Sequence, residues 1–125
     1  MSKEVRILLV DDERDFAESM AFWLEARGFT TIVEHNCENA LKMIKENAPD
    51  VIFLDIVMPG INGLTMLRMI REFNDDVPVI MMSSFIKDSK AEDEPRAYNV
   101  SGVFCKGDDL SKALHLIKSA LKSES

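Results

Sequence analysis

The sequence predicts an α/β fold in which five parallel strands form a doubly wound sheet with helices on both faces. Two observations support this prediction. Short apolar runs alternate along the chain with segments whose apolar residues recur at the helical spacing of three and four. Most of the short runs are apolar at every position, which is typical of strands buried on both faces of a parallel sheet. Regular alternation of strand and helix then favours right-handed crossovers that place helices on both faces.

The predicted strands are short and spread over the whole chain. They are Val5 to Val10, Thr30 to Val33, Val51 to Leu54, Val79 to Met82 and Val103 to Cys105. The helical segments between and after them carry apolar stripes: Phe16, Met20 and Leu24; Ala40, Leu41 and Ile44; Leu64, Leu67 and Ile70; Leu110, Leu114, Ile117 and Leu121. Gly28 is a candidate C-cap for the first helix, and the second helix should end just before Pro49.

The interval between the fourth and fifth strands differs from the other connections. Residues 85–99, FIKDSKAEDEPRAYN, are polar and acidic with few apolar anchors. A long helix packed on the sheet is therefore not expected there. Because proline is best tolerated at the first position of a helix, a short or irregular fourth helix should begin near Glu94 or Pro95.

Composition limits the classes of protein and partner. A chain of 125 residues is long enough for one domain, residues 1–125, and too short for two. The net charge of −7 disfavours nucleic acid and anionic membranes as partners. The start, MSKEVR, has no apolar signal core, and no apolar stretch approaches the roughly 20 residues that span a bilayer, so we expect a soluble cytoplasmic protein. Cys37 and Cys105 predict reduced thiols, and His35 and His115 are expected at the surface because neither has a partner at metal-binding spacing.

Chemically useful side chains follow four of the five predicted strands. They are Asp11 and Asp12 after the first, Asp55 after the third, Ser83 after the fourth and Lys106 after the fifth. In an open parallel sheet, ligands bind outside the carboxyl ends of the strands. If the first and third strands are neighbours, the three carboxylates converge and would suit Mg²⁺. A carboxylate nucleophile, a divalent cation, an ammonium and a hydroxyl are together the parts expected for phosphoryl transfer to aspartate.

Each of these residues alone has a more ordinary explanation. Acidic residues at the start of a helix cap it or interact with its dipole, and this interpretation accounts for Glu13 and Asp15. Taken singly, Ser83 would be a cap or loop hydroxyl and Lys106 a solvated surface lysine. Only their common position at strand ends favours a shared site.

Four motifs resemble, in order and over essentially the whole chain, the receiver domain of two-component response regulators. They are LLVDDE with Asp11 and Asp12, LDIVMPGINGL with Asp55, PVIMMSS with Ser83, and VFCK with Lys106. The resemblance implies a flavodoxin-like sheet with the strand order 2-1-3-4-5. It also implies that Asp55 is a phosphoacceptor whose donor is a sensor histidine kinase or a histidine phosphotransfer protein.

The resemblance further implies roles for the neighbouring residues. Asp12 would bind the Mg²⁺ cofactor directly together with the phosphoacceptor, Asp11 would act largely through water, and the main-chain carbonyl of Val57 would complete the ligand set. Lys106 would pair with the phosphoryl oxygens, and Ser83 would move to donate a hydrogen bond to them, which would be the switch. Such a domain catalyses its own phosphorylation and turns over no separate substrate.

The sequence departs from the family pattern at several positions near the expected output face. Val103 replaces an aromatic residue, Gly107 a proline, and Ser84 a smaller residue. Asn99 replaces a glycine, which is acceptable where the backbone is left-handed. We expect residues 85–99 to signal by ordering or disordering rather than by rotation of an aromatic ring.

Two other functions stay open at this point. The chain could be a receiver-like interaction scaffold that is no longer phosphorylated. It could also be a small Mg²⁺-dependent phosphatase with Asp55 as nucleophile, although the sequence offers no candidate for a second acid/base group.

Overall fold

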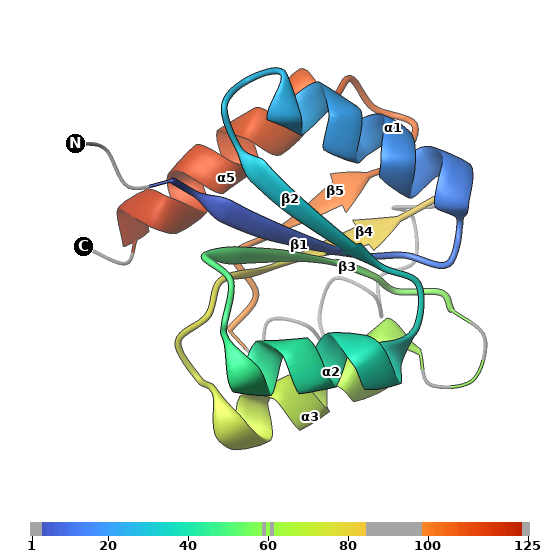
Figure 1. The fold of residues 1–125 in the computed structure, drawn as a ribbon, viewed down its shortest axis with the longest axis vertical. Coiled ribbons are helices and arrows are strands. Elements are labelled where there is room, and N and C mark those ends of the chain that lie inside the picture. The colour runs from blue at the N-terminus through green and yellow to red at the C-terminus, as the bar shows by residue number, and fades with distance from the viewer. Residues whose placement is uncertain (1–3, 59, 61, 85–98, 124–125) are drawn as a thin grey trace.

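Five parallel strands form one sheet in the order β2-β1-β3-β4-β5, which confirms the predicted fold class (Figure 1). The computed structural model describes residues 4–58, 60, 62–84 and 99–123. The strands are β1 (Arg6–Val10), β2 (Thr30–Glu34), β3 (Val51–Asp55), β4 (Val79–Ser83) and β5 (Gly102–Cys105). Each predicted strand is therefore correct to within one residue at one end.

Helices cover both faces of this sheet. They are α1 (Arg14–Glu25), α2 (Cys37–Glu46), α3 (Gly63–Phe73) and α5 (Ser111–Ser123). Helices α1 and α5 lie on one face, and α2 and α3 lie on the other (Figure 1). The expected short fourth helix near Glu94 or Pro95 falls within residues 85–98 and so lies outside the described residues, as does most of the segment expected to order or disorder.

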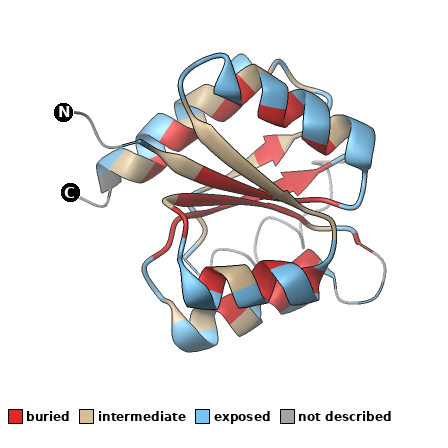
Figure 2. Ribbon diagram, viewed as in Figure 1, coloured by how far each residue is buried: buried red, intermediate tan, exposed pale blue. Residues whose placement is uncertain are grey.

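The sheet separates two apolar cores. Alternate residues of the central strands point to opposite faces, so Leu8 and Ile52 pack beneath α2 and α3, whereas Phe53 and Phe104 pack beneath α1 and α5. The rings of Phe53 and Phe104 meet edge to face with centroids 6.4 Å apart. Strands β3 and β4 are buried at every position, but β2, at the edge, is only half-buried throughout (Figure 2). Burial on both faces therefore holds for the centre of the sheet and not for this edge.

Asparagine side chains begin two helices at the carboxyl edge of the sheet. The side chains of Asn36 and Asn62 cap α2 and α3 by accepting hydrogen bonds from backbone amides three residues later, each worth about 1 kcal/mol. Helix α2 ends at Glu46, before Pro49 as predicted. Helix α1 ends earlier than predicted, with Ala26 as its C-cap, and Gly28 lies in the following turn with φ +95°.

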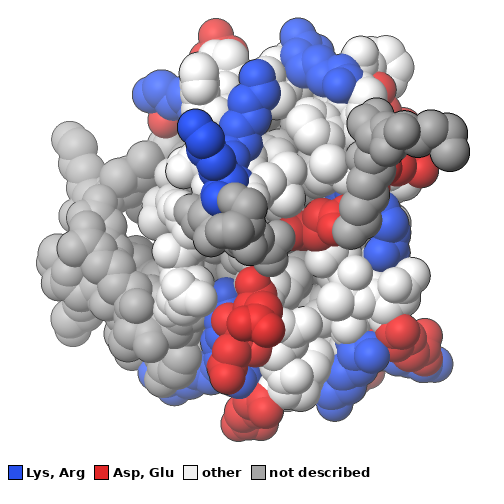
Figure 3. Space-filling model, turned by 90° about the vertical axis from the view of Figure 1, so that its left-hand side faces the viewer, with Lys and Arg blue, Asp and Glu red and all other residues white. Residues whose placement is uncertain are grey.

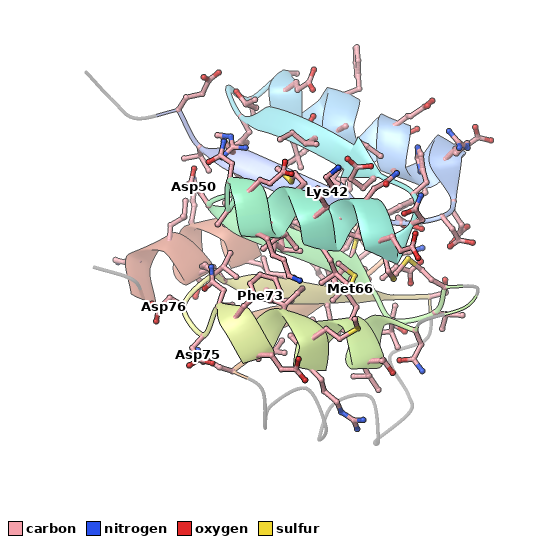
Figure 4. The ribbon with its side chains drawn as sticks, turned by 60° about the horizontal axis from the view of Figure 1, so that its bottom comes forward. Lys42, Asp50, Met66, Phe73, Asp75 and Asp76 are labelled. Carbon is pink, nitrogen blue, oxygen red and sulfur yellow. The ribbon has the colours of Figure 1, made fainter. Side chains whose placement is uncertain are left out.

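The segment that enters β5 is anchored to the end of α3. Arg71 donates hydrogen bonds to the carbonyl oxygens of Asn74 and Asn99, both at 3.0 Å. Asn99 has φ +59°, so its backbone is left-handed. This is the conformation in which asparagine is an acceptable replacement for glycine, as expected from the sequence. Figure 4 shows Phe73 and Met66 of α3 on the side that faces α2, where the Lys45 ammonium lies 5.1 Å from the Phe73 ring centroid.

Charge is mixed on the face at the amino ends of the strands. Lysine and arginine side chains alternate there with aspartate and glutamate, and the described part of this face shows no continuous basic patch (Figure 3). Of the helices in the described part of the chain, none is both long enough and apolar enough to span a bilayer.

Candidate functional site

The candidate residues gather at the carboxyl edge of the sheet. Strand β1 pairs with β3, so the condition under which the carboxylates should converge is met. Asp11 follows β1, and Asp55 is the last residue of β3. One oxygen atom from each of Asp11, Asp12 and Asp55 lies within 4.8 Å of the other two. The acidic cluster is therefore a feature of the fold itself and not only of the sequence.

The ammonium of Lys106 contacts two carboxylates of the acidic cluster and that of Glu13. Its Nζ atom is 2.8 Å from Asp11 Oδ2, 2.8 Å from Asp55 Oδ2 and 2.7 Å from Glu13 Oε1. The side chain of Lys106 is only 7% exposed, so its interpretation as a solvated surface lysine is wrong. An ammonium has three N–H groups, which equals the number of carboxylates that it contacts among the described residues.

Backbone groups fix the two buried carboxylates. The amide of Val57 donates to Asp55 Oδ1 at 3.1 Å, and the amide of Glu13 donates to Asp11 Oδ1 at 2.9 Å. The Asp11 carbonyl oxygen lies 2.9 Å from Nδ1 of His35. Asp11 Oδ2 is buried and accepts no hydrogen bond from the described residues, so its ion pair with the ammonium is its main compensation.

Burial governs the protonation of the site. It raises the pKa of Asp55 to about 6; Lys106 and the Val57 amide oppose that shift, while Asp11 adds to it. Burial alone would lower the pKa of Lys106, but its close contacts with three carboxylates outweigh burial and raise it. Asp55 is thus mostly ionised at neutral pH. One ammonium then faces several carboxylates, and the excess negative charge favours a further cation.

The donor atoms fit a hard divalent cation such as Mg²⁺. All three groups of the cluster offer carboxylate oxygens, the ligands that Mg²⁺ prefers. Asp11 and Asp55 are buried, whereas Asp12 is exposed, so the cluster is open to water on one side. This suits an ion that keeps several water ligands. Val57 lies beside the cluster, with its amide on Asp55 and its side chain 73% exposed.

Ser83 lies on the same edge, one strand away from Asp55. It is buried, although sequence alone also allowed an ordinary loop hydroxyl. Its carbonyl oxygen accepts the backbone amide of Lys106 at 2.9 Å, and the paired strands place it opposite Cys105. The main chain thus connects the position of the hydroxyl to that of the ammonium.

Two residues near the site were assigned ordinary roles from the sequence. Glu13 stands at the N-cap position of α1, but its side chain makes no capping hydrogen bond and instead contacts Lys106, 93 residues away. The capping interpretation is therefore wrong for this side chain. His35 is half-buried against the Asp11 backbone rather than free at the surface. The two cysteines are free thiols, as predicted.

Gly63, the first residue of α3, allows this helix to pack against the backbone at the end of β3. A Cβ atom added there would lie 2.1 Å from the Asp55 carbonyl oxygen and 2.7 Å from the Ile56 Cα. Backbone atoms cannot move away cheaply, so we expect Gly63→Ala to lower the free energy of unfolding by about 2 kcal/mol or more. Urea denaturation measures this loss.

Gly107→Ala is the matched control for that measurement. An added Cβ at Gly107 meets no atom within 4 Å, and its φ is not positive. We expect its stability to change by less than about 0.5 kcal/mol. Equal losses in the two variants would contradict the importance of the close approach at Gly63.

Comparison with known proteins places these observations in context. The sequence profile of the response regulator receiver domain matches residues 7–118. Response regulator MprA of Mycobacterium ulcerans is 39% identical over 88 residues, which cover 70% of this chain and 37% of that protein. MprA of Mycobacterium tuberculosis is 38% identical over the same lengths. The chain thus matches over little more than a third of the length of these curated relatives.

Solved structures share the fold over nearly all of the chain. The receiver domain of the Francisella response regulator 1452 has a TM-score of 0.88 at 24% identity and covers 98% of this chain and 100% of its own. NtrX from Brucella abortus, solved in complex with ADP, has a TM-score of 0.89 at 27% identity and covers 98% of this chain and 28% of its own.

Proposed function

The chain belongs to the response regulator receiver family, and on this premise we propose that residues 1–125 form one receiver that is phosphorylated on Asp55. The donor is the phosphohistidine of a sensor histidine kinase or of a histidine phosphotransfer protein. The observation that carries the proposal is the buried ammonium of Lys106, which lies 2.8 Å from both Asp55 and Asp11. A receiver of this kind acts on itself and turns over no separate substrate.

The residues of the site account for the reaction as follows. A carboxylate oxygen of Asp55 attacks phosphorus, and the bond from phosphorus to the donor nitrogen breaks as the new bond to oxygen forms. The Val57 amide and the Lys106 ammonium orient the carboxylate, because each contacts a different oxygen of Asp55. With its pKa at about 6, Asp55 is mainly the carboxylate that the attack requires at neutral pH.

Mg²⁺ is the proposed cofactor, held by Asp12 and Asp55 directly, by Asp11 through water and by the Val57 carbonyl. When bound, it supplies positive charge that offsets the charge of the phosphoryl oxygens. Lys106 provides the second positive charge from within the protein. Ser83 is the proposed switch residue, since it is a buried hydroxyl on the strand next to Asp55 and shares a backbone hydrogen bond with Lys106.

The proposal also includes the cellular compartment and the partners of the domain. It places the domain in the cytoplasm as a component of a two-component phosphorelay, with no direct contact to nucleic acid or membrane.

The test is intact mass after incubation with acetyl phosphate, with and without Mg²⁺. We expect one phosphoryl adduct per chain that requires Mg²⁺, is lost on treatment with hydroxylamine as an acyl phosphate would be, and maps to the peptide that contains Asp55. No adduct in a folded protein that binds Mg²⁺ would contradict the proposal and favour an unphosphorylated scaffold. Continuous release of phosphate, many times the amount of protein, would favour the phosphatase instead.

A further inference from the structure

Glu13 contacts the centre of the site, yet none of the roles above uses it. Its Oε1 atom is 2.7 Å from Lys106 Nζ, the shortest of the three ion pairs that this ammonium makes. Its side chain is 59% exposed, whereas those of Asp11 and Asp55 are 0% and 4% exposed. The Glu13 carboxylate makes no capping hydrogen bond to α1. Lys106 is thus paired with two buried carboxylates and one that water can solvate.

The three contacts compete once a phosphoryl group is attached to Asp55. The ammonium donates hydrogen bonds to Glu13 and Asp55 and forms an ion pair with Asp11 at 2.8 Å. A phosphoryl group brings new acceptor oxygens beside Lys106, and these compete with the existing partners for the ammonium. Releasing Asp11 would leave a fully buried carboxylate without its ion pair, which is costly. Releasing Glu13 returns an exposed carboxylate to water and costs little.

We propose that Glu13 is the exchangeable partner of Lys106: it pairs with the ammonium in the resting protein and gives way to the phosphoryl group. This inference rests on the proposed phosphorylation of Asp55. Glu13 acts through Lys106 and is a positioning residue, not a catalytic one. Because it occupies one N–H group and adds negative charge beside the site, it slows phosphorylation by an anionic donor.

Glu13→Gln tests this proposal, with Asp15→Asn as the matched control. Both substitutions remove one negative charge from an exposed position at the start of α1, but Asp15 makes no described contact with Lys106. We expect Glu13→Gln to raise the rate of adduct formation at low acetyl phosphate about threefold or more. Asp15→Asn should change the rate by less than about 1.5-fold. The difference between the variants isolates the pairing from the general effect of charge.

The carbon-13 NMR signal of the Glu13 carboxyl group, recorded in the wild-type and Asp15→Asn proteins, gives a second readout. If the role of Glu13 were purely structural, phosphorylation would not shift this signal. On phosphorylation, this signal should shift towards that of a solvated glutamate, and Asp55→Asn treated in the same way should show no shift. Wild-type protein that forms no adduct would overturn the proposed function and this inference together. An adduct in wild type, with equal rates in the Glu13 and Asp15 variants or an unmoved Glu13 signal, would overturn this inference alone.

Discussion

Asp55→Asn is expected to abolish the Mg²⁺-dependent adduct completely and, at the same time, to stabilise the metal-free protein at neutral pH. The amide lacks the carboxylate oxygen that attacks phosphorus in the proposed reaction, so we expect no phosphoryl group to be accepted. An asparagine of nearly the same shape has one oxygen, which can still accept from the Val57 amide, whereas its NH2 group replaces the oxygen that accepts from Lys106. The substitution removes the negative charge of Asp55. Burial disfavours this charge, but the proposed phosphorylation requires it.

The sign of the stability effect follows from the pKa of Asp55. In the folded protein this pKa is raised from its ordinary value of 3.8 to about 6. Between those values the folded protein binds more protons at this group than the unfolded chain does, so its contribution to stability falls as the pH rises. The ionised Asp55 therefore destabilises the wild-type protein to its full extent above about pH 6. There, Asp55→Asn should be more stable than the wild type by about 1 to 3 kcal/mol. At pH 4 the gain should nearly vanish.

Thermal unfolding in a chelator at pH 4 and pH 7, together with intact mass, measures both effects. Asp12→Asn is the control, because Asp12 is exposed and its loss should change stability by less than about 0.5 kcal/mol. An adduct that persists in Asp55→Asn would show that another residue accepts the phosphoryl group. No gain in stability at pH 7 would show that Lys106 already compensates the Asp55 charge fully.

The sequence predicted those features that depend on local pattern or on the general geometry of parallel sheets. The central strands are apolar at every position because both of their faces are buried, and this made their positions predictable to within one residue. Asp11, Asp55 and Lys106 could be grouped because carboxyl ends of parallel strands share one edge. The end of α1 was placed less well, since Gly28 marks the following turn rather than the cap itself.

The contacts that sequence analysis missed depend on side chains that meet across the fold. Glu13 lies in a run of acidic residues whose ordinary explanation is a helix start, and nothing local distinguishes it from Asp15. Its contact with Lys106 exists because β5 ends near the start of α1, although the two residues are 93 positions apart. His35 is similar, since its ring reaches the Asp11 backbone only after β2 has paired with β1.

Lys106→Met is expected to lower the free energy of unfolding of the metal-free protein by about 3 kcal/mol or more at pH 7. Methionine fills much of the same space but carries no charge. Asp11, Glu13 and Asp55 then face one another without their common cation, and two of them are buried. Like charges at short range in a buried site repel strongly, and the two buried carboxylates, Asp11 and Asp55, also lose the contact that compensated their removal from water.

Two conditions should restore part of the lost stability. Lys106 lowers the pKa of Asp55, so its removal raises that pKa further and the folded variant takes up a proton more readily. The variant should therefore become more stable as the pH falls from 7 to 5, and by more than the wild type does. Added Mg²⁺ should also stabilise it more than wild type, because a cation that binds the folded state replaces the missing charge.

Lys112→Met separates this effect from the loss of any lysine. The Lys112 ammonium lies 3.3 Å from Asp108 Oδ2, but the two side chains are 63% and 34% exposed, and water screens their attraction. Its loss should therefore cost less than about 0.5 kcal/mol. Equal losses in the two variants, in urea denaturation at pH 7, would mean that the buried ammonium does not balance the carboxylates. A large loss confined to Lys106→Met, relieved by acid and by Mg²⁺, would identify excess negative charge as the cause. The same excess charge would favour a metal ion at this edge of the sheet.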